Sequence, residues 1–450
     1  MNRRDAPPNS ETSRRTGAKP ADAAALPTFI ERSDALPLVD LYVVCETGAM
    51  HDPVGREGAL HLALRTLRRG TRARSAREID AALDRLGAEL STSVDATAAT
   101  VHAAVIRRNL PALLDLFGDI LNEPSFPATE FAQVAREVRA DLIDSRDDDR
   151  TLAGRWFRRT LFAGHPFGRP ASGTPRTLTA LTREHSMRAW KRTAVGTNLL
   201  LAAAGDITDD ELQAFRARIL PRLPSGEAPV RDLDPPRPLR GRRLVIVDKP
   251  ARSQTQIYIG NLGSHPRDRD HLALVLGNTI FGGTFTARLM REVRSKRGWS
   301  YGASSRLGRD RTREAWSMWT FPAAADAPGC VKLQLDLVRK LVEGGVTERE
   351  LSFAKSFLGR SQAFDVDTPT KRLWRRLDRR LLGLPANFHD RYVERLQAVT
   401  RDEVNAALQR RLSPDDLLIS VVATASELRT SLERAIPHLE STLVVPYETD

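Results

Sequence analysis

A proline-rich stretch without hydrophobic periodicity divides this chain into two halves of similar length. Residues 220–243 read LPRLPSGEAPVRDLDPPRPLRGRR, a composition typical of an extended interdomain linker. On both sides of it the pattern follows one rough order: strand, helix, helix, strand pair, helices, strand. A repeated order of elements indicates a duplicated unit. We therefore predict two similar α+β domains, residues 36–220 and 244–450, joined by a linker at 221–243.

The first half shows this order most clearly. Residues 37–46 form a β-rich run, and residues 57–69 carry apolar side chains at helical spacing. A second helix is expected over 75–90, and the Thr- and Val-rich segment 91–106 alternates as a half-buried strand pair does. In the second half, strands are expected at 244–247, 254–260, 300–306, 314–321 and 417–423, and helices at 271–281, 287–297, 328–343 and 348–364.

Composition and length exclude several classes of protein. The 41% hydrophobic and 28% charged residues are typical of a folded globular chain. No run approaches the roughly 18 apolar residues that cross a bilayer, so no membrane partner is predicted. Residues 1–35 lack the apolar core of a signal peptide and are expected to be a disordered tail. The two cysteines indicate neither a disulfide framework nor a thiolate zinc site, which favours a cytoplasmic protein.

The net charge of +12 is compatible with acidic partners, nucleic acid among them. Nearly all the excess is Arg spread over the expected helices, and no nucleic-acid-binding motif concentrates it. We interpret the charge as a solvated basic surface and predict no nucleic-acid partner. The acidic tract at residues 147–149 is likewise interpreted as a solvated loop.

The most informative motif is FGGTFTARLMREVRSKRGWSY at residues 281–301. Taken alone, it reads as a glycine turn followed by a basic amphipathic helix. As a whole it resembles the C-terminal-half signature of the M16 (pitrilysin-like, insulinase-like) peptidases. The matching residues are Gly282, Gly283, Arg288, Leu289, Arg294, Gly298 and Tyr301. The resemblance implies two LuxS/MPP-like α/β domains, each an antiparallel sheet backed by helices, arranged as half of a clamshell.

The segment GALHLALRTLRRGT at residues 58–71 occupies the place of the catalytic helix in that family. Active members are similar to G-x-x-H-x-x-E-H followed by Gly-Thr. Aligned on the Gly-Thr, the first ligand position is His61, the general-base Glu position holds Leu64, and the second His position holds Arg65. The family's remaining acidic ligand aligns with Asp141.

The substitutions in this helix remove its chemistry. In an HxxEH helix the two imidazoles bind zinc and the carboxylate activates the metal-bound water. Leu64 cannot act as a base, and the Arg65 guanidinium cannot ligate and repels a divalent cation. We therefore expect no cofactor in this chain and no catalysis by it alone. Alternative interpretations are a structural His61 and an ion pair between Arg65 and Asp141.

Arg294 and Tyr301 are the candidate substrate-binding residues. In two-chain members of the family, one chain brings the zinc helix and the other brings an Arg–Tyr pair from this signature, so the resemblance implies a role in trans. A phenol or guanidinium can donate to a developing oxyanion or to peptide carbonyls. The alternative is that the pair only closes a helix-to-strand turn.

The function implied is that of the non-catalytic, substrate-binding subunit of a heterodimeric M16 zinc metallopeptidase, with zinc in the partner subunit and a peptide as substrate. Two alternatives stay open: a structural or binding protein of this fold without a peptidase partner, and a leader-peptide-binding accessory in peptide maturation.

Overall fold

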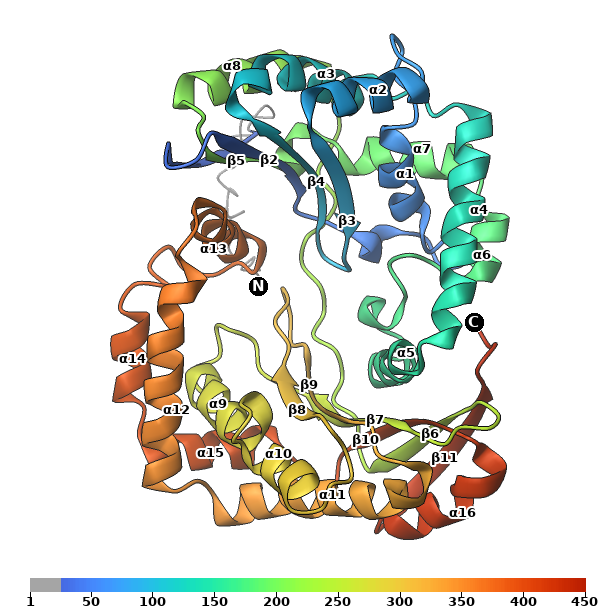
Figure 1. The fold of residues 1–450 in the computed structure, drawn as a ribbon, viewed down its shortest axis with the longest axis vertical. Helices are drawn as coiled ribbons and strands as arrows, with labels where there is room; N and C mark the ends of the chain where they lie inside the picture. Colours follow the sequence, from blue (N-terminus) through green and yellow to red (C-terminus); the bar gives the residue numbers. More distant parts are fainter. Residues whose placement is uncertain (1–25) are drawn as a thin grey trace, which may run out of the picture.

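The computed structural model describes residues 26–450, which form two domains, each a sheet backed by helices (Figure 1). The first sheet has the order β1-β5-β2-β4-β3 and the second the order β11-β6-β10-β7-β9-β8. The strands are β1 (Thr28–Arg32), β2 (Leu38–Cys45), β3 (Glu89–Val94), β4 (Ala99–Ile106), β5 (Leu199–Gly205), β6 (Arg242–Asp248), β7 (Gln256–Leu262), β8 (Ala303–Leu307), β9 (Ala315–Thr320), β10 (Leu418–Ala423) and β11 (Leu439–Pro446).

The two sheets share one topology. Each strand of the first sheet has a counterpart in the second, in the same spatial order and with the same relative direction. The second sheet has one additional strand, β11, at its edge. The predicted duplication of an α+β domain is thereby confirmed. The sheets are mixed rather than wholly antiparallel, because β1 pairs parallel with β5, and β6 pairs parallel with β10 and β11. Long connections, such as the one from β1 to β5, allow parallel pairing.

The prediction that residues 1–35 form a disordered tail is wrong at its C-terminal end. Thr28–Arg32 is strand β1, which adds to the sheet beside β5, and Leu26 is buried in the core. The rest of the predicted tail, residues 1–25, lies outside the described residues. Strand β1 was not predicted because it is short and because β5, its partner in the sheet, lies far along the chain.

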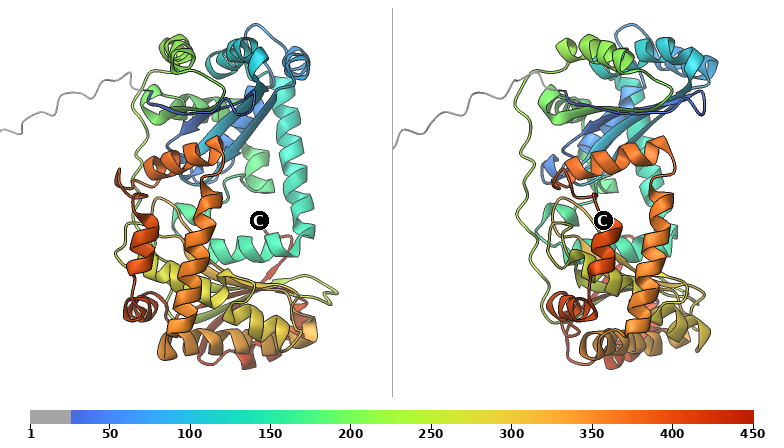
Figure 2. Two further views of the ribbon diagram at one scale, coloured as in Figure 1. Left: turned by 60° about the vertical axis from the view of Figure 1, so that its left-hand side comes forward. Right: turned by 90° about the vertical axis from the view of Figure 1, so that its left-hand side faces the viewer.

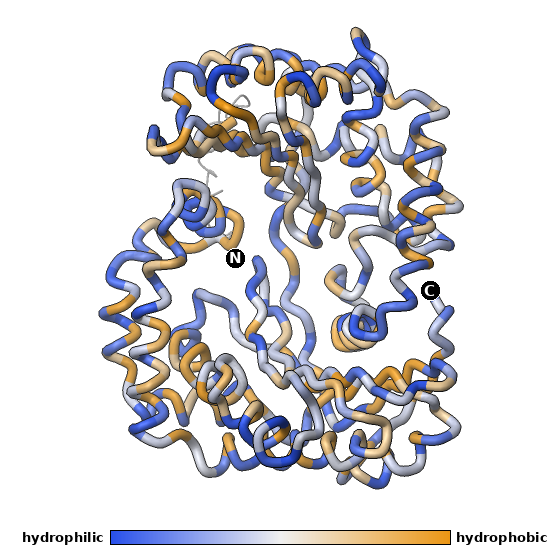
Figure 3. The backbone as a smooth tube through the Cα atoms, in the orientation of Figure 1, coloured by the Kyte–Doolittle hydropathy of each residue, from blue (hydrophilic) through white to orange (hydrophobic). Residues whose placement is uncertain are grey.

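Helices surround both sheets (Figures 1 and 2). Those of the first domain are α1 (Ala59–Leu67), α2 (Ala76–Leu86), α3 (Leu110–Asn122), α4 (Ala128–Asp144), α5 (Asp149–Leu161), α6 (Pro175–Ala180), α7 (Arg183–Thr193) and α8 (Asp209–Ile219). Those that follow the linker are α9 (His271–Asn278), α10 (Arg288–Met290), α11 (Ala327–Gly344), α12 (Glu348–Ser361), α13 (Pro369–Leu381), α14 (Tyr392–Ala398), α15 (Arg401–Arg411) and α16 (Ala425–Ala435). Figure 3 shows hydrophobic stretches in the strands and in the helices that cover them.

Each sheet is apolar on both faces, and one face is covered by a helix from the other half of the chain. In β2, the side chain of Val43 joins the first-domain core, whereas Tyr42 and Val44 face the opposite side. Leu373 and Leu377 of α13 cover that side. Reciprocally, α5 covers the second sheet with the apolar side chains of Leu152, Ala153, Trp156, Phe157 and Leu161. The two domains therefore exchange one covering helix each.

Buried ion pairs fix both exchanged helices. Arg380 of α13 donates to both oxygens of Glu46 at the end of β2, and Arg231 of the linker lies 2.6 Å from the same carboxylate, which is 1% exposed. At the start of α5, Asp149 accepts from Lys249 over 2.7 Å. Asp148 caps α5 by accepting from two backbone N–H groups. The tract at 147–149, predicted as a solvated loop, is thus the anchored beginning of a helix.

The predicted linker is extended. Residues 223–241 contain no helix or strand. His51 and His165 of the first domain each place a ring nitrogen 2.9 Å from a linker carbonyl, those of Val230 and Asp234. The linker is therefore held along the first domain rather than free.

One helical run, His271–Ser295, is long and apolar enough to cross a membrane. No run of this kind was expected from the sequence. The run comprises α9, α10 and two π-helical turns, η7 (Thr279–Gly283) and η8 (Arg291–Ser295). More than half of its most apolar window is buried inside the second domain. Such burial is typical of a core helix.

The exchange of helices predicts a stability effect across the domain boundary. Leu377→Ala removes a fully buried side chain between α13 and the first sheet, so we expect a loss of roughly 2–5 kcal/mol in the free energy of unfolding. Chemical denaturation measures it. Leu36→Ala, at a side chain that is 63% exposed, is the control and should change little. Equal effects of the two changes would contradict the packing described.

Candidate functional site

The helix that carries the degenerate motif is well formed. Gly58 precedes α1 with φ 94°, a conformation that favours glycine. The buried carboxylate of Asp52 accepts hydrogen bonds from the N–H groups of Gly58 and Leu60, over 3.0 and 3.2 Å, at the helix N-terminus. The helix is therefore capped and packed, and the lost motif residues have not disturbed its fold.

Leu64 lies in the hydrophobic core. Its side chain is 0% exposed and packs among the buried leucines of the first domain. The position that aligns with the general base is therefore held by a core side chain, and a carboxylate there would be buried without a partner.

His61, Arg65 and Asp141 are electrostatic neighbours. Burial and, to a smaller extent, the charge of Arg65 lower the pKa of His61 to about 4, while the charge of Asp141, on α4, opposes the shift. His61 is therefore neutral at neutral pH. The alternative of an ion pair between Arg65 and Asp141 does not hold in the structure, because no such contact lies within 4.0 Å and Asp141 is exposed.

The donor set at this position does not fit zinc. One neutral imidazole, one exposed carboxylate and a guanidinium offer two ligands, whereas structural and catalytic zinc sites use three or four from the protein. Within residues 26–450, no group of three His, Cys, Asp or Glu side chains is placed to hold a metal ion.

The predicted substrate-binding residues Arg294 and Tyr301 lie in the second domain. Figure 1 places α1 and α10 in opposite halves of the molecule. After α10 the chain continues through η8, turns at Gly298 with φ 67° and enters β8. Arg294 belongs to η8, and Tyr301 lies in the turn that leads into β8. The structure therefore does not bring the two predicted clusters together within one chain.

Arg294 is held between two aromatic rings. Its guanidinium carbon lies 4.4 Å from the centroid of Tyr301 and 4.6 Å from that of Phe285. The tyrosine is 77% and the phenylalanine 68% exposed, so both rings face solvent. Cation–π contact orients the guanidinium while leaving its N–H groups available. Phe285 was not singled out from the sequence; its place in the glycine-rich part of the motif was the available signal.

The remaining motif residues support this cluster. Arg288 donates to both oxygens of Glu350, over 2.7 and 2.6 Å, and Leu289 is fully buried. A Cβ at Gly282 would lie 2.6 Å from the backbone nitrogen of Ser305, so glycine is required there for close packing against β8. The motif therefore divides into residues that fix the segment and residues that are presented to solvent.

Comparison with known proteins identifies relatives of this chain. Residues 29–174 match the family profile "Insulinase (Peptidase family M16)", and residues 180–358 match "Peptidase M16 inactive domain". An "uncharacterized zinc protease" of Mycobacterium tuberculosis is 29% identical over 365 residues, covering 79% of this chain and 82% of that protein. The "non-peptidase homolog YmxG" of Helicobacter pylori is 21% identical over 403 residues, covering 89% and 92%.

A similar fold has been solved. The crystal structure of a peptidase M16 inactive domain from Pseudomonas fluorescens matches with a TM-score of 0.80 and 24% identity, covering 88% of this chain and 95% of that chain. At that identity the likeness establishes the fold alone.

Restoring the motif should require two changes at once. Leu64→Glu alone places an unpaired carboxylate in the core and should cost roughly 3–5 kcal/mol of stability. Arg65→His alone keeps Leu64, so no carboxylate beside the two imidazoles offsets the charge of the zinc ion. Leu64→Glu with Arg65→His should gain melting temperature on zinc addition, as neither single variant does. Differential scanning fluorimetry with and without zinc measures this. An Arg65→His chain stabilised as much as the double variant would show that the alignment is misplaced.

His61 should also make the fold acid-sensitive. Its pKa is about 4 in the folded chain against an ordinary value of 6.5, so the unfolded chain takes up the proton first as pH falls. The contribution of neutral His61 to stability is complete above about pH 6.5 and is lost towards pH 4. His61→Gln should reduce that decline in denaturation measured across this range. Exposed His438, whose φ of 52° asparagine tolerates, gives the control His438→Asn.

Proposed function

Because the chain belongs to the M16 peptidase family, we propose that it is the non-catalytic, substrate-binding subunit of a two-chain zinc metallopeptidase that processes or degrades peptides. The observation that carries the proposal is the pairing of a degenerate zinc helix with an exposed Arg294–Tyr301 cluster. This chain lacks the residues that would bind zinc and activate water, but it has the residues that would contact a substrate.

The partner would supply what this chain lacks. An HxxEH-bearing M16 subunit brings the two imidazoles, the general base and the zinc ion, whose chemistry is to activate water and polarise the scissile carbonyl. This chain's own residues would bind and orient the peptide. The match to a family of inactive domains and the likeness to a non-peptidase homolog support this division of labour.

Arg294 and Tyr301 suit two roles at such a shared site. The Tyr301 hydroxyl can donate to an oxyanion forming at the scissile carbonyl, and the oriented Arg294 guanidinium can donate to peptide carbonyls. The Tyr301 ring is 77% exposed and the half-buried Arg294 lies against it, on a surface that a second subunit can face.

An edge strand offers the backbone of a peptide a place to bind. Strand β3 ends the order of the first sheet, and in the described residues it pairs only with β4. It also packs beside α1. A peptide added to this edge would gain main-chain hydrogen bonds that tolerate many sequences.

The proposal predicts different effects for the two residues in the assembled complex. Tyr301→Phe should lower turnover by roughly 10²–10³, the usual loss for one oxyanion donor. Arg294→Ala should mainly raise KM, because it removes binding felt equally in the ground and transition states. Steady-state kinetics of the complex measures both.

The control is Arg291→Ala, on the same π-helical turn, whose side chain is 55% exposed. It should leave the kinetics unchanged, and all three variants should keep the melting temperature and co-purify with the partner. Normal assembly together with wild-type hydrolysis in both Arg294→Ala and Tyr301→Phe would reduce this chain to a scaffold, the structural alternative.

A further inference from the structure

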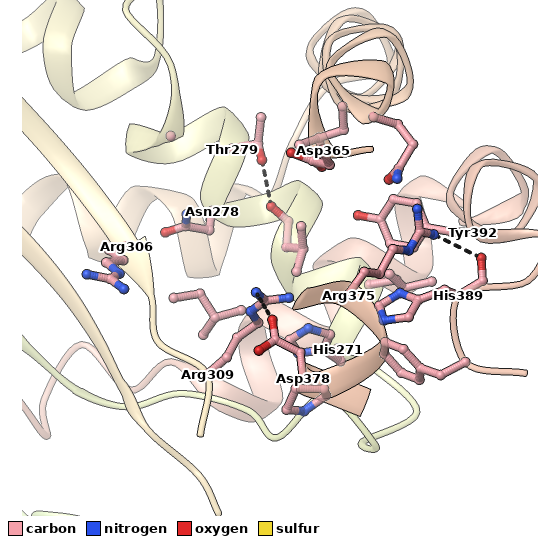
Figure 4. A pocket seen from close by; sticks show the side chains of 18 of the residues that line it. His271, Asn278, Thr279, Arg306, Arg309, Asp365, Arg375, Asp378, His389 and Tyr392 are labelled. Atoms are coloured by element: carbon pink, nitrogen blue, oxygen red, sulfur yellow. Dashed lines mark hydrogen bonds and ion pairs between the residues drawn. The ribbon is translucent and has the colours of Figure 1, made fainter. Parts of the chain in front are cut away.

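The second domain contains a cavity of about 870 Å³ that no step of the proposed function uses (Figure 4). Its walls come from α9, β8, α12, α13 and the segment leading into α14. Helix α13 closes one side while its Leu373 and Leu377 cover the first sheet. A volume of this size falls in the range of ligand sites, which hold roughly 300–1,000 Å³.

The charged groups lining this cavity leave a positive surplus. Four cationic side chains line it against two carboxylates. The cations are Arg306, Arg309, Lys371 and Arg375, and the carboxylates are Asp365 and Asp378.

Three of the cations are poorly neutralised. Arg306 is exposed and has no carboxylate within 4.0 Å among the described residues. Arg309 lies 3.8 Å from Asp378, beyond hydrogen-bonding distance, and half of its side chain is exposed. Arg375 donates to the backbone carbonyl of His389 over 3.2 Å, and within the described residues no carboxylate lies within 4.0 Å of it. Lys371, in contrast, already pairs with Asp367.

Two histidines add hydrogen-bonding capacity without charge. Burial, together with Arg309, lowers the pKa of both His271 and His389 to about 4, so both rings are neutral at neutral pH. His271 is 5% exposed and engages Ser264 through Nδ1. The Nε2 atom of His389 is buried and has no hydrogen-bond partner among the described residues. A buried polar atom without a partner is costly, and a bound ligand would satisfy it.

The apolar part of the wall combines aliphatic and aromatic side chains. The aromatic residues are Trp374 on α13, Phe388 ahead of α14 and Tyr392 at the start of α14. The site therefore combines guanidinium groups, a neutral imidazole without a partner and aromatic rings. That combination suits a carboxylate carried beside an apolar side chain.

We propose that this cavity binds a carboxylate of a peptide ligand, held by Arg309 and Arg375, with the adjoining apolar side chain against the aromatic wall. The inference rests on the proposed role in peptide binding and deepens it by naming the chemical group selected. The carboxylate can be the α-carboxylate of the peptide or that of an acidic side chain.

The test measures the affinity of the full chain for fluorescein-labelled peptides by anisotropy. One peptide ends in Ala-Leu-Phe with a free carboxylate, and its match is amidated. A second amidated pair differs only by Glu or Gln next to the Phe. We expect the free acid, the Glu peptide, or both to bind about tenfold or more tightly than the uncharged match, the usual gain for a charge-assisted contact.

The variants Arg309→Gln and Arg375→Gln identify the anchors. Each should shrink the affinity ratio between charged and uncharged peptides towards one, whereas general damage to the fold would weaken both peptides and leave their ratio intact. Arg77→Gln, at an exposed arginine of α2 in the first domain, is the matched control and should keep the ratio.

The outcomes separate this inference from the proposed function. Equal affinity for charged and uncharged peptides, or an unchanged ratio in both variants, overturns carboxylate recognition and leaves peptide binding in place. Failure of every peptide to bind overturns both proposals. A ratio that falls equally in Arg77→Gln would show that net charge, rather than the cavity, selects the peptide.

Discussion

The structure depends on burying sheets that are hydrophobic on both faces. A strand such as β5, with six of its seven residues buried, cannot leave either face to water, and the helices of its own domain cover only one. The second face is covered from the other half of the chain, by α13 on the first sheet and α5 on the second. This exchange makes the two halves mutually dependent, and it also places α13 where its polar side closes the cavity of the second domain.

The helix that resembles the zinc helix, α1, keeps its fold although the residues that would bind zinc are absent. Its fold depends on the Asp52 cap, on Gly58 and on buried leucines, none of which needs a metal. A leucine at position 64 adds to that core. The side chains that could act on a substrate are found instead on the exposed surface of the second domain, where Tyr301 and Phe285 hold Arg294 between their rings. The packed α1 helix and the solvent-facing pair of Arg294 and Tyr301 thus lie in different domains.

The arginine excess has several structural uses, which composition alone does not separate. Arg380 neutralises a buried carboxylate between the domains, Arg288 fixes the motif segment, and Arg294 stacks between aromatic rings. Arg309 and Arg375 differ from Arg380 and Arg288 because no nearby carboxylate neutralises them fully. The same side chain is therefore structural or available for a ligand according to the partners that the fold brings to it.

The sequence by itself determined the duplication, the linker, the family resemblance and the loss of the zinc ligands, because these follow from local periodicity and from residue identities at fixed spacing. Ser75 as a helix cap and the strand pair after α2 were predictable for the same reason. Only the tertiary structure decided the place of β1, the parallel edges of both sheets, the exchange of α5 and α13, the stacking of Phe285 on Arg294 and the cavity around Arg309 and Arg375. Apart from the stacking of Phe285 on Arg294, which is local, each of these joins residues far apart along the chain. Such contacts leave no periodic signal in either segment alone.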